Sequence, residues 1–136
     1  MLIAQSINRT DNVIPSTNAV FYQNACYFAI AEGDIDALDR IKDLTASVLA
    51  NATSYPPAYY SWCSLQFILK TDNPQIAIAG RNKDQIALEI LSNTNFNCFV
   101  YPSNNDHSIP FLKGKTADKT TIYVFRDFSC KKPVHN

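Results

Sequence analysis

Cys130 is the residue best placed to do covalent chemistry. It follows an expected strand and precedes Lys131 and Lys132, and neighbouring cations favour the reactive thiolate form of a cysteine. The chain has four widely separated cysteines and no C-x-x-C pair: Cys26, Cys63, Cys98 and Cys130. This spacing argues against a zinc site, so reduced, mostly buried thiols are the favoured interpretation. A thiol redox role for Cys130 is kept as an alternative.

Ser16 and Asn18 are candidates for ligand binding, together with the aromatic residues Tyr59 and Trp62. Tyr55 and Tyr60 extend that aromatic cluster, and aromatic ring faces can stack on a pyranose in sugar sites. The other interpretation is structural. Serine and asparagine are preferred helix caps, and aromatic side chains in helices mostly pack in cores. The structural interpretation is favoured, and a carbohydrate-binding or carbohydrate-processing protein remains the alternative.

No complete catalytic or cofactor site is visible in the sequence. The string Ile76–Gly80 before an expected helix resembles the start of a dinucleotide-binding unit, but the further glycines of that fingerprint are missing, which favours a plain strand-to-helix turn. His107 lies in a polar stretch with no nucleophile at a fixed spacing, and His135 lies next to the C-terminal residue. We therefore expect no metal, no cofactor and no catalytic activity of the chain alone.

Length and composition indicate one globular domain. The chain has 136 residues, of which 46% are hydrophobic, and its 12 basic and 12 acidic side chains cancel. This balance argues against nucleic-acid and membrane-surface partners. No stretch approaches the roughly 20 apolar residues of a membrane span. The first residues lack the basic and apolar segments of a signal peptide, so we expect a cytoplasmic protein.

The first half of the chain has the pattern of three helices. Residues 1–14 are polar and predict an arm or loop. The first helix should start at Ser16 or Thr17, continue to residue 32 and end at Gly33. Asp34 should cap a second, amphipathic helix that ends near residue 51 and packs antiparallel to the first. A third helix is expected over residues 58–70, after Pro57.

The second half has the pattern of a small sheet with one helix. Strands are expected at residues 75–79, 96–101 and 120–125, with a helix at 84–91, a loop at 102–107, a brief apolar segment at 109–112 and a loop-like tail. The sequence thus predicts an α+β fold: a helical hairpin and a third helix packed with a β-α-β-β sheet of about three strands.

The first and third expected helices are apolar on more faces than the rest of so small a chain can cover. Soluble monomers avoid large contiguous apolar patches. We therefore expect these helices to be buried against another copy, another protein or a further domain.

Three strings in this order resemble the C-terminal region of a large family of thioredoxin-domain proteins, whose animal members are called spermatogenesis-associated proteins. The strings are Pro15–Val20, Ile76–Gly80 and Tyr123–Val124 with Ser129–Pro133 close behind, and the resemblance covers about residues 11–133. Ser16 and Asn18 match the first string. Similar proteins often carry a second cysteine where this chain has Phe125, which weakens a paired-thiol role for Cys130.

The resemblance implies architecture and no reaction. Residues 15–70 would correspond to the last hairpin of a helical toroid like that of six-hairpin glycosidases, and residues 71–136 to a small α/β C-terminal segment, together one compact unit. The thioredoxin-like domain and most of the toroid have no counterpart in this sequence. The expected function is a non-catalytic docking or oligomerisation module whose partner is itself or a thioredoxin-domain, helical-toroid protein.

Overall fold

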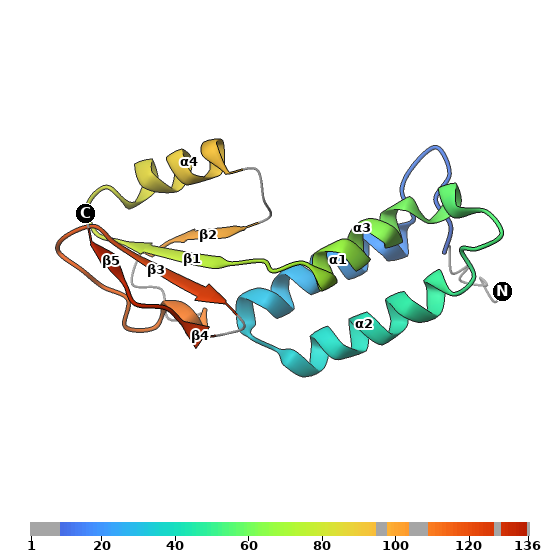
Figure 1. The fold of residues 1–136 in the computed structure, drawn as a ribbon, viewed down its shortest axis with the longest axis horizontal. Coiled ribbons are helices and arrows are strands. Elements are labelled where there is room, and N and C mark those ends of the chain that lie inside the picture. Colours follow the sequence, from blue (N-terminus) through green and yellow to red (C-terminus); the bar gives the residue numbers. More distant parts are fainter. Residues whose placement is uncertain (1–8, 95–97, 104–108, 127–128, 136) are drawn as a thin grey trace, which may run out of the picture. The chain divides into compact units, whose positions relative to one another are not determined.

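The computed structural model describes residues 9–94, 98–103, 109–126 and 129–135. The chain divides into two compact units (Figure 1). The helical unit holds the described residues up to Ile30 and Asp34–Lys70, and the α/β unit holds Ala31–Gly33 and the described residues from Thr71 onward. The predicted α+β class is confirmed. That the helical and α/β parts form one compact unit stays a prediction.

The helical unit contains α1 (Thr17–Glu32), α2 (Ile35–Leu49), the 3-10 turn η1 (Pro56–Tyr59) and α3 (Tyr60–Lys70). Asp34 caps α2 as predicted, because its carboxylate accepts a hydrogen bond of 2.9 Å from the Ala37 N–H. The third helix differs from its prediction: its first turn is 3-10, and the α-helix begins only at Tyr60. Figure 1 shows α1 and α3 running in the same direction and α2 running back.

The carboxylate of Asp11 joins the N-termini of α1 and α3. Its Oδ1 accepts from the Ser16 N–H at 2.7 Å and its Oδ2 from the Ser61 N–H at 2.8 Å. The Asp11 N–H in turn donates to the Ala58 carbonyl at 2.7 Å, and the side chain is buried. Described residues 9–14 are irregular in conformation. Asp11 nevertheless fixes this part of the predicted arm to both helices.

Trp62 is at the centre of the helical core. Its side chain is fully buried, its indole N–H donates to the Arg9 carbonyl at 2.8 Å, and its ring lies 6.0 Å from that of Tyr22. Other fully buried side chains of this unit include Ser16, Cys26, Thr45 and Leu65. Because Trp62 is the only tryptophan of the chain, its fluorescence reports on this unit alone.

The α/β unit is a five-stranded mixed sheet with one helix and a 3-10 turn. Its elements are β1 (Gln75–Ala79), α4 (Lys83–Asn93), β2 (Phe99–Pro102), η2 (Pro110–Leu112), β3 (Thr121–Arg126), β4 (Ser129–Cys130) and β5 (Val134–His135). The order is β2-β1-β3-β4, and β5 also pairs with β3. The central strand β1 is parallel to β2 and antiparallel to β3, with Ala77 opposite Tyr101 and Tyr123.

Each face of β1 packs against a different connection. Ile76 and Ile78 point to the α4 side, where they form a core with Ala87. Ala77 points to the opposite side and packs with Leu112 of η2 and Phe125 of β3. All five residues of β1 are buried, which explains why the strand continues after Gln75 as the apolar run Ile76–Ala79 instead of an alternating pattern.

The C-terminal tail differs from its prediction. Residues 129–135 are not a loop, because they supply the short strands β4 and β5 that pair antiparallel with β3. The second strand begins at Phe99, whereas it was expected over residues 96–101, and part of that range lies outside the described residues. His107 and most of the predicted 102–107 loop also lie outside them.

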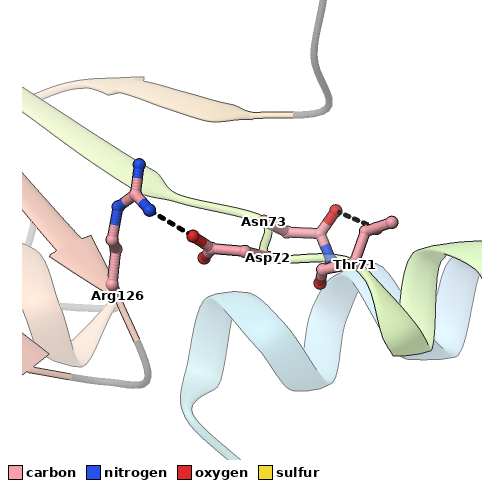
Figure 2. Close-up of polar contacts among 4 residues, drawn as sticks. All are labelled: Thr71, Asp72, Asn73 and Arg126. Carbon is pink, nitrogen blue, oxygen red and sulfur yellow. Dashed lines mark hydrogen bonds and ion pairs between the residues drawn. The ribbon is translucent and has the colours of Figure 1, made fainter.

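An ion pair joins the segment before β1 to the end of β3. Figure 2 shows the Arg126 guanidinium and the Asp72 carboxylate pointing at each other, with Asn73 and Thr71 alongside. The Asn73 amide donates to the Thr71 carbonyl at 2.8 Å. Both charged side chains are half exposed, and such pairs contribute roughly 0–1 kcal/mol. The contact therefore aligns the strand ends more than it stabilises the fold.

Candidate functional site

Helix α1 carries a strip of exposed apolar side chains, the α1 strip: Val20, Phe21, Tyr27 and Phe28. The ring of Phe21 is 62% exposed and that of Phe28 is 69% exposed. These residues fall in two pairs separated by two helical turns, so they share one face of the helix. The opposite face carries the buried residues Ala19, Cys26, Ala29 and Ile30.

The α1 strip has one charged neighbour on the helix, the exposed Glu32, which ends α1 one turn after Phe28. From Thr17 to Ala31 the sequence contains no lysine, arginine, aspartate or glutamate. A helix at the surface of a protein normally has charged residues on its solvent-facing side. A helix that is apolar on all sides is normally buried on all sides. α1 therefore has the composition of a helix packed on two sides.

Helix α3 shows the same property more weakly. Tyr60 and Phe67, again two turns apart, are exposed, with Phe67 at 61%, and the only charged residue of α3 is Lys70. By contrast, the outer face of α2 carries Asp36, Asp39, Arg40, Lys42 and Asp43. Exposed apolar side chains also occur elsewhere, for example Ile35 on α2 and Leu88 on α4, but the candidate docking surface is placed on α1 and α3 because these helices carry so few charged residues.

Ser16 and Trp62, two of the predicted ligand-binding residues, are used by the fold. Ser16 is fully buried, and its hydroxyl accepts from the Ala19 N–H at 3.3 Å, as a helix cap does. Trp62 is 1% exposed. Asn18 on α1 and Tyr59 in η1 are half-buried. Ligand binding by these four side chains stays a prediction, and Ser16 and Trp62 offer almost no surface to a ligand.

The four cysteines are all free thiols. Cys26 is buried and Cys98 half-buried, but Cys63 and Cys130 are exposed, so the expectation of mostly buried thiols is only half right. Cys130 lies in the edge strand β4, where its thiol donates to the Lys131 carbonyl at 3.3 Å. Accessibility is a requirement for redox chemistry and does not show it; a redox role for Cys130 stays a prediction.

Burial raises the pKa of the Cys26 thiol from 9.0 to about 11. The unfolded thiol loses its proton near pH 9 while the folded one keeps it, so the unfolded state binds fewer protons as pH rises through this window. We expect the stability that the buried, protonated Cys26 contributes to be fully present below pH 9 and to be lost by about pH 11. This loss should lower the free energy of unfolding by roughly 2 kcal/mol.

Urea denaturation followed by far-UV circular dichroism at the two ends of this pH window measures the decrease. The variant Cys26→Ala should lose less stability than the wild-type chain over the same interval, because it has no thiol to ionise at that position. Equal losses in both proteins would show that other groups carry the pH dependence.

Within the residues that the structure describes, no group of three or more histidine, cysteine, aspartate or glutamate side chains is placed to hold a metal ion. In the same part of the chain, no helix has both the length and the apolar character needed to cross a membrane.

Comparison with known proteins finds no match for this chain among protein-family models, curated proteins or solved structures. The resemblance to thioredoxin-domain proteins therefore stays an expectation from the sequence strings alone.

Asp11 is the structurally decisive residue that sequence reasoning missed. Its partner Ser61 lies 50 positions away, so no local pattern pairs them. The available signal was an isolated aspartate a few residues before the Pro15–Ser16 helix start, which is a weak one because aspartate is common in loops.

Proposed function

We propose that this chain is a non-catalytic cytoplasmic docking module whose α1 packs against further helices of a helical-toroid, thioredoxin-domain protein. The exposed α1 strip carries the proposal. Two phenylalanine rings more than 60% exposed on one face of a helix whose only charged residue is the terminal Glu32 are costly in water, since burying each large apolar side chain gains roughly 1.5–3 kcal/mol.

The proposed occupant is a helix pair with an apolar face. The α1 strip consists of two adjacent pairs of side chains two turns apart on one face of the helix, with the exposed Asn24 between them, and a ridged face of this kind suits the grooves of another helix better than a flat sheet edge or a nucleic acid. The lack of charge over Thr17–Ala31 gives no electrostatic recognition. The resemblance of residues 15–70 to a toroid hairpin supports the same choice, because neighbouring hairpins in a toroid pack helix on helix.

The solution mass of the chain tests this proposal. We expect light scattering to show a monomer of 15.2 kDa for the chain alone and a stable complex when it is mixed with a separately encoded helical-toroid, thioredoxin-domain protein from the same genome. A tight homodimer that excludes this protein would show that a second copy covers α1. A monomer that binds nothing would reject docking through α1.

A pair of matched variants locates the interface. Phe28→Ser should weaken the complex at least about tenfold, because exposed aromatic side chains dominate interface energies. Leu88→Ser is the control: Leu88 lies on α4 in the other unit and is as exposed as Phe28, 68% against 69%. Equal weakening by both variants would place the contact elsewhere, and circular dichroism of each free variant checks that it is folded.

A further inference from the structure

We propose that a pocket at the carboxyl ends of β1 and β2 binds a small molecule through its phosphate monoester group. The pocket has a volume of about 540 Å³ and is lined by Ala79, Gly80, Arg81, Lys83, Ser103 and Lys115, with the segment 116–118 at its edge. All of these residues belong to the α/β unit. The inference is independent of docking through α1.

The pocket lies where the two parallel strands send their connections to opposite faces of the sheet. The chain leaving β1 forms α4, which packs with Ile76 and Ile78 on one face. The chain leaving β2 forms η2, which packs with Ala77 on the other. Such a divergence opens a crevice at the carboxyl edge of a sheet, and this is where ligands bind in open α/β sheets. In this chain the pocket described above lies at that edge.

Positive charge predominates in the pocket. Its lining includes three cations, Arg81, Lys83 and Lys115, against one acid, Asp118, although the chain as a whole is neutral. The Lys83 ammonium also lies 3.6 Å from the exposed carboxylate of Asp84, which is outside the lining. The Lys115 ammonium is held over two aromatic rings of β3, 4.8 Å from the centre of the Tyr123 ring and 5.7 Å from that of Phe125.

Arg81 is the cation most available to a ligand. Among the described residues its guanidinium forms no ion pair, whereas the guanidinium of Arg126 is held by Asp72 (Figure 2). A guanidinium presents donors in a fixed fork that matches two phosphate oxygens, and charge-assisted bonds of this kind are about twice as strong as neutral ones. Arg81 is therefore expected to supply the largest single contribution.

Backbone geometry adds to the attraction. Gly80 has a φ of +109°, and the turn it makes leads into the N-terminus of α4, an 11-residue helix. The side chain of Asn82 at the N-cap makes no capping hydrogen bond to that helix, so it does not compete with a ligand for the N–H groups at the positive end of the helix dipole. The hydroxyl-bearing Ser103 and Thr116 and the Asp118 carboxylate suit a polar, hydroxylated body attached to the phosphate.

The pocket is formed by residues that lie far apart in the sequence, so the sequence alone did not indicate a phosphate site there. The string Ile76–Gly80 alone favoured a plain strand-to-helix turn, because the further glycines of a phosphate-binding fingerprint are absent. Lys115 comes from the other side of the sheet, after η2, and is brought to the pocket by the fold, where the Ser103 hydroxyl donates to its carbonyl at 3.1 Å.

Titration of the whole chain with inorganic phosphate, followed by amide NMR shifts at constant ionic strength, tests the proposal. We expect saturable shifts at Gly80–Lys83 and Lys115–Asp118 with a dissociation constant on the order of 1 mM, and tighter binding of a phosphorylated polar molecule such as glycerol 3-phosphate. Shifts that rise linearly without saturation, or that chloride reproduces at the same ionic strength, would reduce the effect to charge screening and overturn the proposal.

Two arginine variants give the decisive comparison. Arg81→Gln should weaken phosphate binding at least about tenfold, because it removes a charge-assisted hydrogen bond. Arg126→Gln removes the same charge from the same unit at the other end of β3 and should leave binding unchanged. Equal weakening by both variants would mean that net charge attracts phosphate without a site. Lys115→Gln, which should also weaken binding, covers the case in which Arg81→Gln fails to fold.

Discussion

Replacing Asp11 with alanine is expected to lower the free energy of unfolding of the helical unit by about 3 kcal/mol. The carboxylate accepts backbone hydrogen bonds from both Ser16 and Ser61, and each hydrogen bond to a charged group contributes about 1.5–3 kcal/mol. The carboxylate also lies at the positive ends of two helix dipoles. Its removal leaves two buried N–H groups without their acceptor.

Urea denaturation followed by the fluorescence of Trp62 measures this loss, because that side chain is buried in the affected unit. Asp34→Ala is the matched control: Asp34 is also a helix-capping aspartate, but it is exposed and accepts one bond, from Ala37. Its replacement should cost about 1 kcal/mol. Asp11→Asn keeps one carbonyl oxygen, so its loss of unfolding free energy should lie between those of Asp11→Ala and Asp34→Ala. If Asp11→Ala costs no more than Asp34→Ala, Asp11 does not join the helices.

Replacing Gly80 with alanine is expected to destabilise the α/β unit by about 3 kcal/mol or more. A Cβ atom at this position would lie 2.7 Å from the Thr120 Cα and 2.8 Å from the Lys119 carbonyl oxygen. Both atoms belong to backbone, so neither can rotate away. The φ of +109° is in addition a conformation that residues with a Cβ rarely adopt.

Gly114 separates the two causes of this loss. It also has a positive φ, of +72°, but nothing lies within 4 Å of a Cβ added there. Gly114→Ala should therefore show only the backbone cost, about 1 kcal/mol. Hydrogen exchange of the β1 amides measures both variants in the unit concerned. Similar losses of stability in the two variants would show that the backbone at Thr120 can move away from a Cβ atom at position 80.

Local patterns in the sequence were sufficient to predict most elements of this fold. Asp34 and Gly33 are capping signals that act within one turn, and the β1 run Gln75–Ala79 was predicted with its observed bounds. β4 and β5 were missed because each is two residues long and is defined by pairing with β3, not by a period of its own. A strand of two residues that is formed only by pairing with another strand has no sequence pattern of its own by which it could be predicted.

The two candidate sites also differ in whether a local sequence pattern could predict them. The surplus of apolar residues on α1 can be read along one helix, so the sequence predicted an exposed apolar face there. The pocket at the carboxyl ends of β1 and β2 could not be predicted, because Arg81 and Lys115 come from segments separated by a strand and two connections. Ser16 and Trp62 also make tertiary contacts that no local pattern predicts, with Asp11 and Arg9 respectively.

The short strands of the tail also limit self-assembly of the sheet. A long open strand edge offers unpaired N–H and C=O groups to any other extended chain, which is how edge-to-edge aggregation begins. β3 has such an outer edge, and β4 and β5 occupy its two ends, at Phe125–Arg126 and Thr121–Ile122. Between them, Lys131 donates to the Val124 carbonyl at 2.8 Å. Residues 129–135 therefore cover this edge of β3, and we expect a chain shortened before Ser129 to aggregate more readily, because the edge of β3 would then be open to pairing with another chain.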